Sequence, residues 1–285
     1  MRQDRYDDTR VKEGLMGQGE IRSLGTIEIA DVVFGLHSNY PKPILWIQDA
    51  YPMFLSRRDP AVHLFIRYQE RRPKGLPMRV SDEPKVAWKG NDFSVKTAYY
   101  QAEGSLSTGK VEATMAPGFS GSGLLRTLLA LLLLREGGFL LHAAGLASGG
   151  KAYVFCGPTQ SGKTTIASQL ANGHTVLNDE TVAIRRTKSG YVAYATPFPG
   201  ELNRVFVNQG ARMDALYFIH KGADFSRRPL APAEVVKQIF PQLICLERTP
   251  EGVEVAFQLL TTFSHEMPCY DLSFRPTMEL WSHLT

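Results

Sequence analysis

The sequence predicts an α/β (α+β) protein in which a mostly antiparallel, β-rich part precedes a mixed-sheet domain. Short apolar runs alternate with turn residues between positions 24 and 116, which is typical of antiparallel strands. Strand-like and helix-like patterns alternate from position 139 onward. A complete G-x-x-x-x-G-K-[ST] segment lies between an apolar run at 152–156 and a helical pattern. Its residues are Gly157, Pro158, Thr159, Gln160, Ser161, Gly162, Lys163, Thr164 and Thr165. We therefore expect a tail over 1–20, a β-rich subdomain over 21–117 and a P-loop domain over 118–285.

Composition is that of a soluble globular chain. Its 285 residues are 44% hydrophobic, and 32 Lys and Arg against 28 Asp and Glu give a formal net charge of +4. Because the basic residues are spread along the chain, we expect no nucleic-acid partner. The densest apolar run, 127–134, is far shorter than the roughly 20 residues that span a bilayer, so we expect no membrane insertion.

Terminal and cysteine patterns favour a cytoplasmic protein. Residues 1–20 are polar, lack the apolar segment of a secretory signal and are expected to form a flexible tail. Cys156, Cys245 and Cys269 lack metal-ligand spacing, which suits free thiols in a reducing compartment. We expect Cys156 to be an inert core thiol rather than a nucleophile.

Elements of the first part are predicted from runs of β-branched and aromatic residues between turn clusters. These runs predict strands over 26–29, 43–47, 62–68, 86–88, 93–100 and 111–114. A Leu-rich helix over 121–135 then ends at Gly137 and Gly138.

The second part is predicted to begin with two neighbouring strands. A strand over 139–146 is joined by turn residues 148–150 to the strand at 152–156, and a helix over 165–170 follows the glycine-rich segment. Further strands are expected over 175–177, 182–185, 191–195, 215–219 and 254–259, with helices over 232–240 and 278–284.

The glycine-rich segment predicts a nucleoside triphosphate site. Gly157 and Gly162 allow the backbone to turn its N–H groups toward phosphate oxygens, and Lys163 adds a positive charge. Thr164 offers a hydroxyl to Mg²⁺, and the positive end of the following helix favours an anion. A glycine-rich turn without a ligand is the alternative.

An acidic pair and a histidine are the next candidates. Asp179 and Glu180 follow the strand at 175–177 directly, where hard oxygen ligands for Mg²⁺ and a base for an attacking hydroxyl are needed. A turn aspartate that caps a hairpin is the alternative. His142 stands in the strand predicted beside the loop strand, as an active-site residue or as a hydrogen-bonded structural one.

Three segments together resemble the C-terminal catalytic domain of the HPr kinase/phosphorylase family, whose fold is related to phosphoenolpyruvate carboxykinase. They are Leu-His-Ala-Ala-Gly at 141–145, the loop at 157–165 and Val-Leu-Asn-Asp-Glu-Thr-Val at 176–182. The resemblance covers about residues 118–285. It is closer to the HPr-kinase-like proteins of bacterial peptide-maturation gene clusters, because residues 268–276 and Trp281 resemble their C-terminus.

The resemblance implies an ATP-dependent serine kinase that uses ATP and Mg²⁺. It implies that Asp179 is the general base, that Glu180 replaces the second aspartate of the family's pair and that His142 is the active-site histidine. Lys163 would bind the phosphates, and the metal ligands would be Thr164, Asp179 and Glu180.

Departures from the family pattern limit what the resemblance implies. Residues 197–204 stand in the place of the signature that serves phosphorolysis, so phosphorylase activity is not expected. Glu201 and Arg204 are candidates for phosphate contacts or for a surface ion pair. Arg275 is another candidate for phosphate or substrate, whereas Arg248 is expected to be solvated.

Partners and alternatives follow from the same comparison. Residues 21–116 show no counterpart of the HPr enzyme's acceptor-binding domain, so the expected acceptor is a serine hydroxyl of another peptide or protein. That enzyme's hexamer suggests a homo-oligomer. A nucleotide-sensing binding module and an ATPase without an acceptor remain alternative functions.

Overall fold

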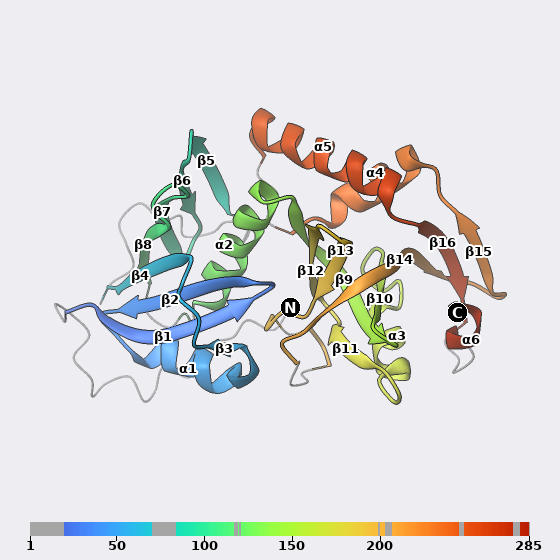
Figure 1. Ribbon diagram of the computed structural model, residues 1–285, viewed down its shortest axis with the longest axis horizontal. Helices are drawn as coiled ribbons and strands as arrows, with labels where there is room; N and C mark the ends of the chain where they lie inside the picture. Colours follow the sequence, from blue (N-terminus) through green and yellow to red (C-terminus); the bar gives the residue numbers. More distant parts are fainter. Residues whose placement is uncertain are drawn as a thin grey trace. The chain divides into compact units, whose positions relative to one another are not determined.

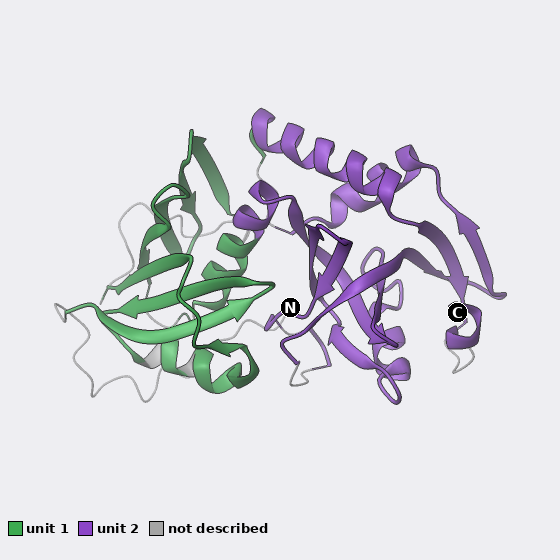
Figure 2. Ribbon diagram, viewed as in Figure 1, with its two compact units in different colours: residues 1–129, 247–249 green, residues 130–246, 250–285 purple. Residues whose placement is uncertain are grey.

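Two compact units make up the chain. A computed structural model describes residues 20–69, 84–116, 119, 121–198, 200–202, 207–244, 248–275 and 280–284. One unit comprises residues 1–129 and 247–249, and the other comprises 130–246 and 250–285 (Figure 2). The division falls inside helix α2 (Ser122–Arg135), which coincides with the predicted Leu-rich helix. Positions 1–19 of the predicted tail lie outside the described residues.

Unit 1 is built on an eight-stranded mixed sheet with the order β3-β1-β2-β4-β8-β7-β6-β5 (Figure 1). Pairs β2–β4 and β4–β8 are parallel, and the other neighbouring pairs are antiparallel. Helix α1 (Lys42–Ala50) and the 3₁₀ helix η2 (Pro52–Phe54) follow β2 in the chain. The strands are β1 (Arg22–Ile29), β2 (Val32–Ser38), β3 (Leu55–Ser56), β4 (Val62–Tyr68), β5 (Lys85–Lys89), β6 (Asp92–Lys96), β7 (Tyr100–Ser105) and β8 (Lys110–Met115).

Unit 2 contains the second mixed sheet, with the order β10-β9-β12-β13-β14-β16-β15 and with β11 paired to β9. Strand β10 also pairs with β14 in parallel, so β10, β9, β12, β13 and β14 form a closed ring of pairings. The strands are β9 (Gly138–Ser148), β10 (Lys151–Cys156), β11 (Thr175–Asn178), β12 (Thr181–Thr187), β13 (Gly190–Tyr194), β14 (Gly210–Lys221), β15 (Ser226–Pro229) and β16 (Cys269–Phe274).

Helices cover both faces of the second sheet. Figure 1 shows α3 and α6 on one face and α4 and α5 on the other. Side chains of α3 and α6 belong to one buried apolar cluster with strands β9, β10, β14 and β16. The helices are α3 (Lys163–Leu170), α4 (Pro232–Ile239), η3 (Phe240–Gln242), α5 (Pro250–Glu266) and α6 (Leu280–Leu284). The expected α+β class is confirmed, with two large mixed sheets and few helices.

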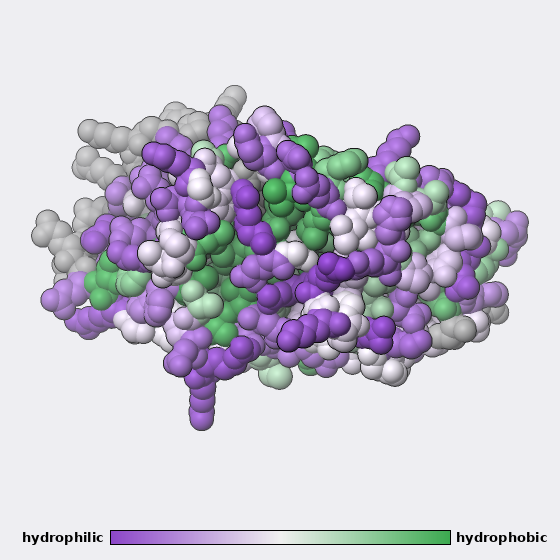
Figure 3. Space-filling view, turned by 45° about the horizontal axis from the view of Figure 1, so that its top comes forward, coloured by the Kyte–Doolittle hydropathy of each residue, from purple (hydrophilic) through white to green (hydrophobic). Residues whose placement is uncertain are grey.

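Polar side chains predominate on the face drawn in Figure 3, and hydrophobic ones gather in smaller areas between them. Within the described parts of the chain, no helix has both the length and the apolar character needed to cross a membrane.

Two predicted strands are helices in the structure. The run 43–47 lies in α1, where Pro43 occupies the first turn and the buried Ile44 and Ile47 are one helical turn apart, with Leu45 exposed between them. The run 254–259 lies in α5. Buried residues of α5 recur every three or four positions (Ala256, Leu260 and Phe263), which is a helical period. The run 254–259 is too short to show this period.

One predicted strand ends earlier than expected, and other strands were missed. The run 93–100 breaks after β6 because the Thr97 hydroxyl accepts hydrogen bonds from the backbone of Tyr99 and Tyr100, at 3.1 and 3.0 Å, and holds a turn. Strand β2 was not predicted. It follows β1 after a two-residue turn at Ala30 and Asp31, whose φ angles are 51° and 62°. Strands β3, β15 and β16 were also not predicted, and neither was β7 beyond its first residue, Tyr100.

Phe263 offers a test of the α5 packing. Its ring is fully buried, with ring centroids 5.3 Å from Phe139 and 4.8 Å from Tyr191. Phe263→Ala should lower the free energy of unfolding by about 3–5 kcal/mol, because it leaves a cavity in the core. Phe257→Ala on the same helix, where the residue is 55% exposed, is the matched control and should change it by less than about 0.5 kcal/mol. Urea titrations measure both values, and equal effects would contradict the packing.

Candidate functional site

The glycine-rich loop connects β10 to α3 at the carboxyl end of β10. Strand β10 lies between the antiparallel β9 and the parallel β14. Ala143 of β9 pairs with Cys156, and His142 pairs with Thr181 of β12. The prediction that His142 lies on the strand next to the loop strand is therefore confirmed.

Both loop glycines are required by close packing. A Cβ at Gly157 would lie 2.7 Å from Ser161 Oγ and 2.9 Å from the Ile219 carbonyl oxygen. Gly162 has a φ of 109°, and a Cβ there would lie 2.7 Å from Phe274 Cζ. The loop backbone thus packs directly against the ends of β14 and β16.

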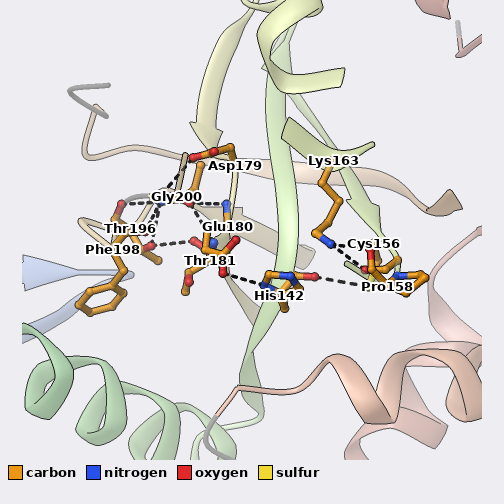
Figure 4. A network of polar contacts seen from close by, with 12 residues as sticks. His142, Cys156, Pro158, Lys163, Asp179, Glu180, Thr181, Thr196, Phe198 and Gly200 are labelled. Atoms are coloured by element: carbon orange, nitrogen blue, oxygen red, sulfur yellow. Dashed lines mark hydrogen bonds and ion pairs between the residues drawn. The ribbon is translucent and has the colours of Figure 1, made fainter. Parts of the chain in front are cut away.

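The Lys163 ammonium is enclosed by the loop. The residue is 6% exposed, and Nζ donates hydrogen bonds to the carbonyl oxygens of Gly157 at 2.7 Å and Pro158 at 3.1 Å (Figure 4). Burial lowers the pKa of Lys163, and the neighbouring Cys156 and Glu180 oppose that shift. An anion bound here would supply the negative charge that the two neutral carbonyls do not.

Other loop residues differ in their surroundings. Ser161 Oγ is buried and has no hydrogen-bond partner among the described residues. Pro158, Thr159 and Gln160 are exposed, while Thr164 and Thr165 are half-buried in the first turn of α3. Burial raises the pKa of the Cys156 thiol to about 12, so the thiol stays protonated and unreactive at neutral pH.

Asn178 builds the turn that carries the acidic pair, and the sequence analysis missed it. Its Oδ1 accepts hydrogen bonds from the backbone N–H groups of Glu180 at 2.7 Å and Thr181 at 2.8 Å. Its side-chain amide donates to the carbonyl oxygens of Thr196 at 2.9 Å and Phe198 at 3.1 Å. An asparagine at the end of an apolar strand was the available signal.

Asp179 lies behind this turn and holds the loop that follows β13. The residue is 1% exposed, and its carboxylate accepts hydrogen bonds from the backbone N–H groups of Gly200 at 3.3 Å and Leu202 at 3.1 Å. Gly200 is needed there, since a Cβ would lie 2.6 Å from Asp179 Oδ2. The contacts of Asp179 are therefore those of a residue that positions a loop.

Glu180 and His142 form an accessible histidine–carboxylate pair. Glu180 Oε1 lies 3.1 Å from His142 Nδ1, and the two side chains are 40% and 27% exposed. In Figure 4 the Glu180 side chain points toward His142, whereas Asp179 points toward Gly200. The Glu180 charge also opposes the lowering of the Lys163 pKa. The structure thus pairs His142 with Glu180, and Lys163 lies on the neighbouring loop.

The remaining candidates lie elsewhere or outside the described residues. Glu201 is exposed, and Arg204 is outside the described residues. The exposed Arg275 pairs with Asp224 at 2.9 Å. No group of three or more His, Cys, Asp or Glu side chains among the described residues is arranged to hold a metal.

Comparisons of this chain with protein-family models and with curated proteins find no match. The family resemblance therefore stays a prediction from the motifs at 141–145, 157–165 and 176–182.

Gly162 offers a test of the loop geometry. Gly162→Ala should lower the free energy of unfolding by roughly 2–4 kcal/mol, because the new methyl group meets Phe274 in a backbone region that disfavours side chains. Gly150→Ala is the matched control, since Gly150 has a φ of 77° and nothing within 4 Å of the added Cβ. The control should lose only about 1–2 kcal/mol. Chemical denaturation of both variants checks this, and equal losses would refute the close packing.

Proposed function

We propose that this chain is an ATP-dependent kinase that transfers the γ-phosphoryl group to a serine hydroxyl of a peptide or protein. The observation that carries the proposal is the enclosed Lys163 ammonium, which lies at the start of α3 and interacts with Glu180 of the Glu180–His142 pair. The order of β10, glycine-rich loop and α3 also supports a P-loop domain of HPr kinase type.

The loop is suited to the phosphates of ATP. Gly157 and Gly162 have no side chains, so the loop backbone can pack closely on the strands. The backbone N–H groups of such a loop can then approach a ligand directly. The buried Ser161 hydroxyl has a hydrogen bond to give. A phosphate oxygen would satisfy both this hydroxyl and the Lys163 charge.

Mg²⁺ would be held by the Thr164 hydroxyl together with phosphate oxygens and water. Mg²⁺ sites in phosphoryl-transfer enzymes combine one or two protein ligands with phosphate oxygens and water, so a dedicated cluster of acidic residues is not needed. The bound ion would neutralise charge on the phosphates.

Phosphoryl transfer assigns different tasks to the side chains. The acceptor oxygen forms a bond to the γ-phosphorus, while the bond from that phosphorus to the β–γ bridging oxygen breaks and ADP leaves with the electron pair. Lys163 stabilises the negative charge that moves to the β-phosphate. The hydroxyl proton passes to a carboxylate of the acidic pair. His142 can orient the carboxylate of Glu180.

The two carboxylates differ in their fitness as the base. The resemblance assigns this role to Asp179, but both of its oxygens already accept backbone hydrogen bonds inside the protein. Glu180 is accessible to an incoming hydroxyl and interacts with both His142 and Lys163. We therefore assign the proton to Glu180 and the positioning of the 200–202 loop to Asp179.

Conservative variants of the acidic pair test this assignment. Glu180→Gln should retain ATP binding and stability but reduce phosphoryl transfer by a factor of about 10²–10⁴, because the amide accepts no proton at neutral pH. Asp179→Asn should lower the free energy of unfolding by about 1–3 kcal/mol, because an amide lacks the second acceptor oxygen. The measurements are transfer from γ-labelled ATP to serine peptides, ATP titration and chemical denaturation.

Two outcomes would change the proposal. Full transfer by Glu180→Gln, together with an inactive but equally stable Asp179→Asn protein, would return the base to Asp179. Release of phosphate without labelling of any hydroxyl acceptor would indicate an ATPase instead of a kinase.

A further inference from the structure

A cavity of about 400 Å³ opens beside the glycine-rich loop. One wall is the loop backbone and side chains from Gly157 to Ser161, and another is the end of β14 from Phe218 to Lys221. Gln238, Gln242 and Asp271 complete the lining. The cavity therefore lies at the carboxyl ends of parallel strands, where open α/β sheets usually bind ligands.

The direction of the triphosphate follows from the neighbours of β10. Glu180 and His142 belong to the β9 and β12 side of β10, whereas the cavity belongs to its β14 side. A triphosphate whose γ end faces Glu180 and Lys163 has its α end toward β14. The group attached to the α-phosphate would then enter the cavity.

The cavity lining carries groups that suit a nucleoside. The side-chain amides of Gln238 and Gln242 each offer a hydrogen-bond donor and an acceptor, as the edge of a purine base requires. Phe218 contributes an apolar surface. Asp271, whose carboxylate lies 3.6 Å from His220 Nδ1, can accept hydrogen bonds from sugar hydroxyls.

A second cationic side chain, that of Lys221, lies between the cavity and the glycine-rich loop. Lys221 lines the cavity, and its Cε lies 3.6 Å from the position that a Cβ on Gly162 would occupy. Lys221 is an exposed residue. It can therefore contact the α- or β-phosphate without competing with Lys163.

We propose that this cavity binds the purine nucleoside part of the triphosphate, with the base against Gln238 and Gln242 and the sugar hydroxyls at Asp271. The assignment rests on the proposed function, because it takes the phosphates to lie in the glycine-rich loop. It adds the residues that would distinguish ATP from a bare polyphosphate.

Calorimetric titrations with ATP and with inorganic tripolyphosphate, both with Mg²⁺, test the base contacts. The unchanged protein should bind ATP more than about tenfold more tightly than tripolyphosphate, because two hydrogen bonds to the base contribute about tenfold and the sugar contacts add to that. The double variant Gln238→Leu, Gln242→Leu should bind ATP about tenfold more weakly than the unchanged protein does, and it should bind tripolyphosphate equally well. Gln258→Leu, whose amide donates to Glu254 at 3.1 Å instead of lining the cavity, is the control and should keep the preference for ATP.

The sugar contacts need a second comparison. The unchanged protein should bind 2′,3′-dideoxy-ATP about three- to tenfold more weakly than ATP, and Asp271→Ala should remove this difference. Asp224→Ala, at an exposed carboxylate paired with Arg275, should preserve it.

The outcomes separate the two proposals. Equal affinity of the unchanged protein for ATP and tripolyphosphate, or an undiminished preference for ATP in the double variant, would overturn the nucleoside site and leave the phosphate loop standing. Failure of both ligands to bind the unchanged protein would overturn the proposed function and this site with it. Retained tripolyphosphate binding shows that the double variant is folded.

Discussion

The site depends on the energetic cost of enclosing the Lys163 ammonium. Removing this charge from water is unfavourable. Among the described residues, two carbonyl oxygens of the loop accept hydrogen bonds from it, and burial lowers its pKa. The surrounding structure holds the charge there nonetheless, because the loop backbone packs against β14 and β16 without room for side chains at Gly157 and Gly162. A buried ammonium whose hydrogen-bond acceptors are neutral carbonyl oxygens favours an anionic ligand.

Sheet pairing brings the other polar groups to this cation. Strand β9 lies between the loop strand and β12, so it places His142 beside both the loop and the turn that carries Glu180. Asn178 and Asp179 hold that turn and the 200–202 segment by buried hydrogen bonds to the backbone. Within this network Glu180 keeps an accessible carboxylate, which is why the proposed chemistry centres on it rather than on its buried neighbour.

The sequence predicts the local elements of the site well, because their signals are short in range. The loop, its flanking strand and helix, and the position of His142 beside them all follow from contiguous patterns. The helices α1 and α5 were not predicted as helices. Packing against the rest of their own unit determines which side chains are buried, and the short apolar runs in the sequence do not show this. The different burial of Asp179 and Glu180, and the cavity beside β14, depend on segments far apart in the chain and carry no local signal.

A crystal structure of the protein with Mg²⁺ and a non-hydrolysable ATP analogue would test most directly where the phosphates bind. We expect the β- and γ-phosphates inside the loop at 157–165, with Lys163 Nζ in contact with phosphate oxygens and Glu180 on the γ side. Phosphates bound away from Lys163, or a γ-phosphate that faces β14 instead of Glu180, would contradict it.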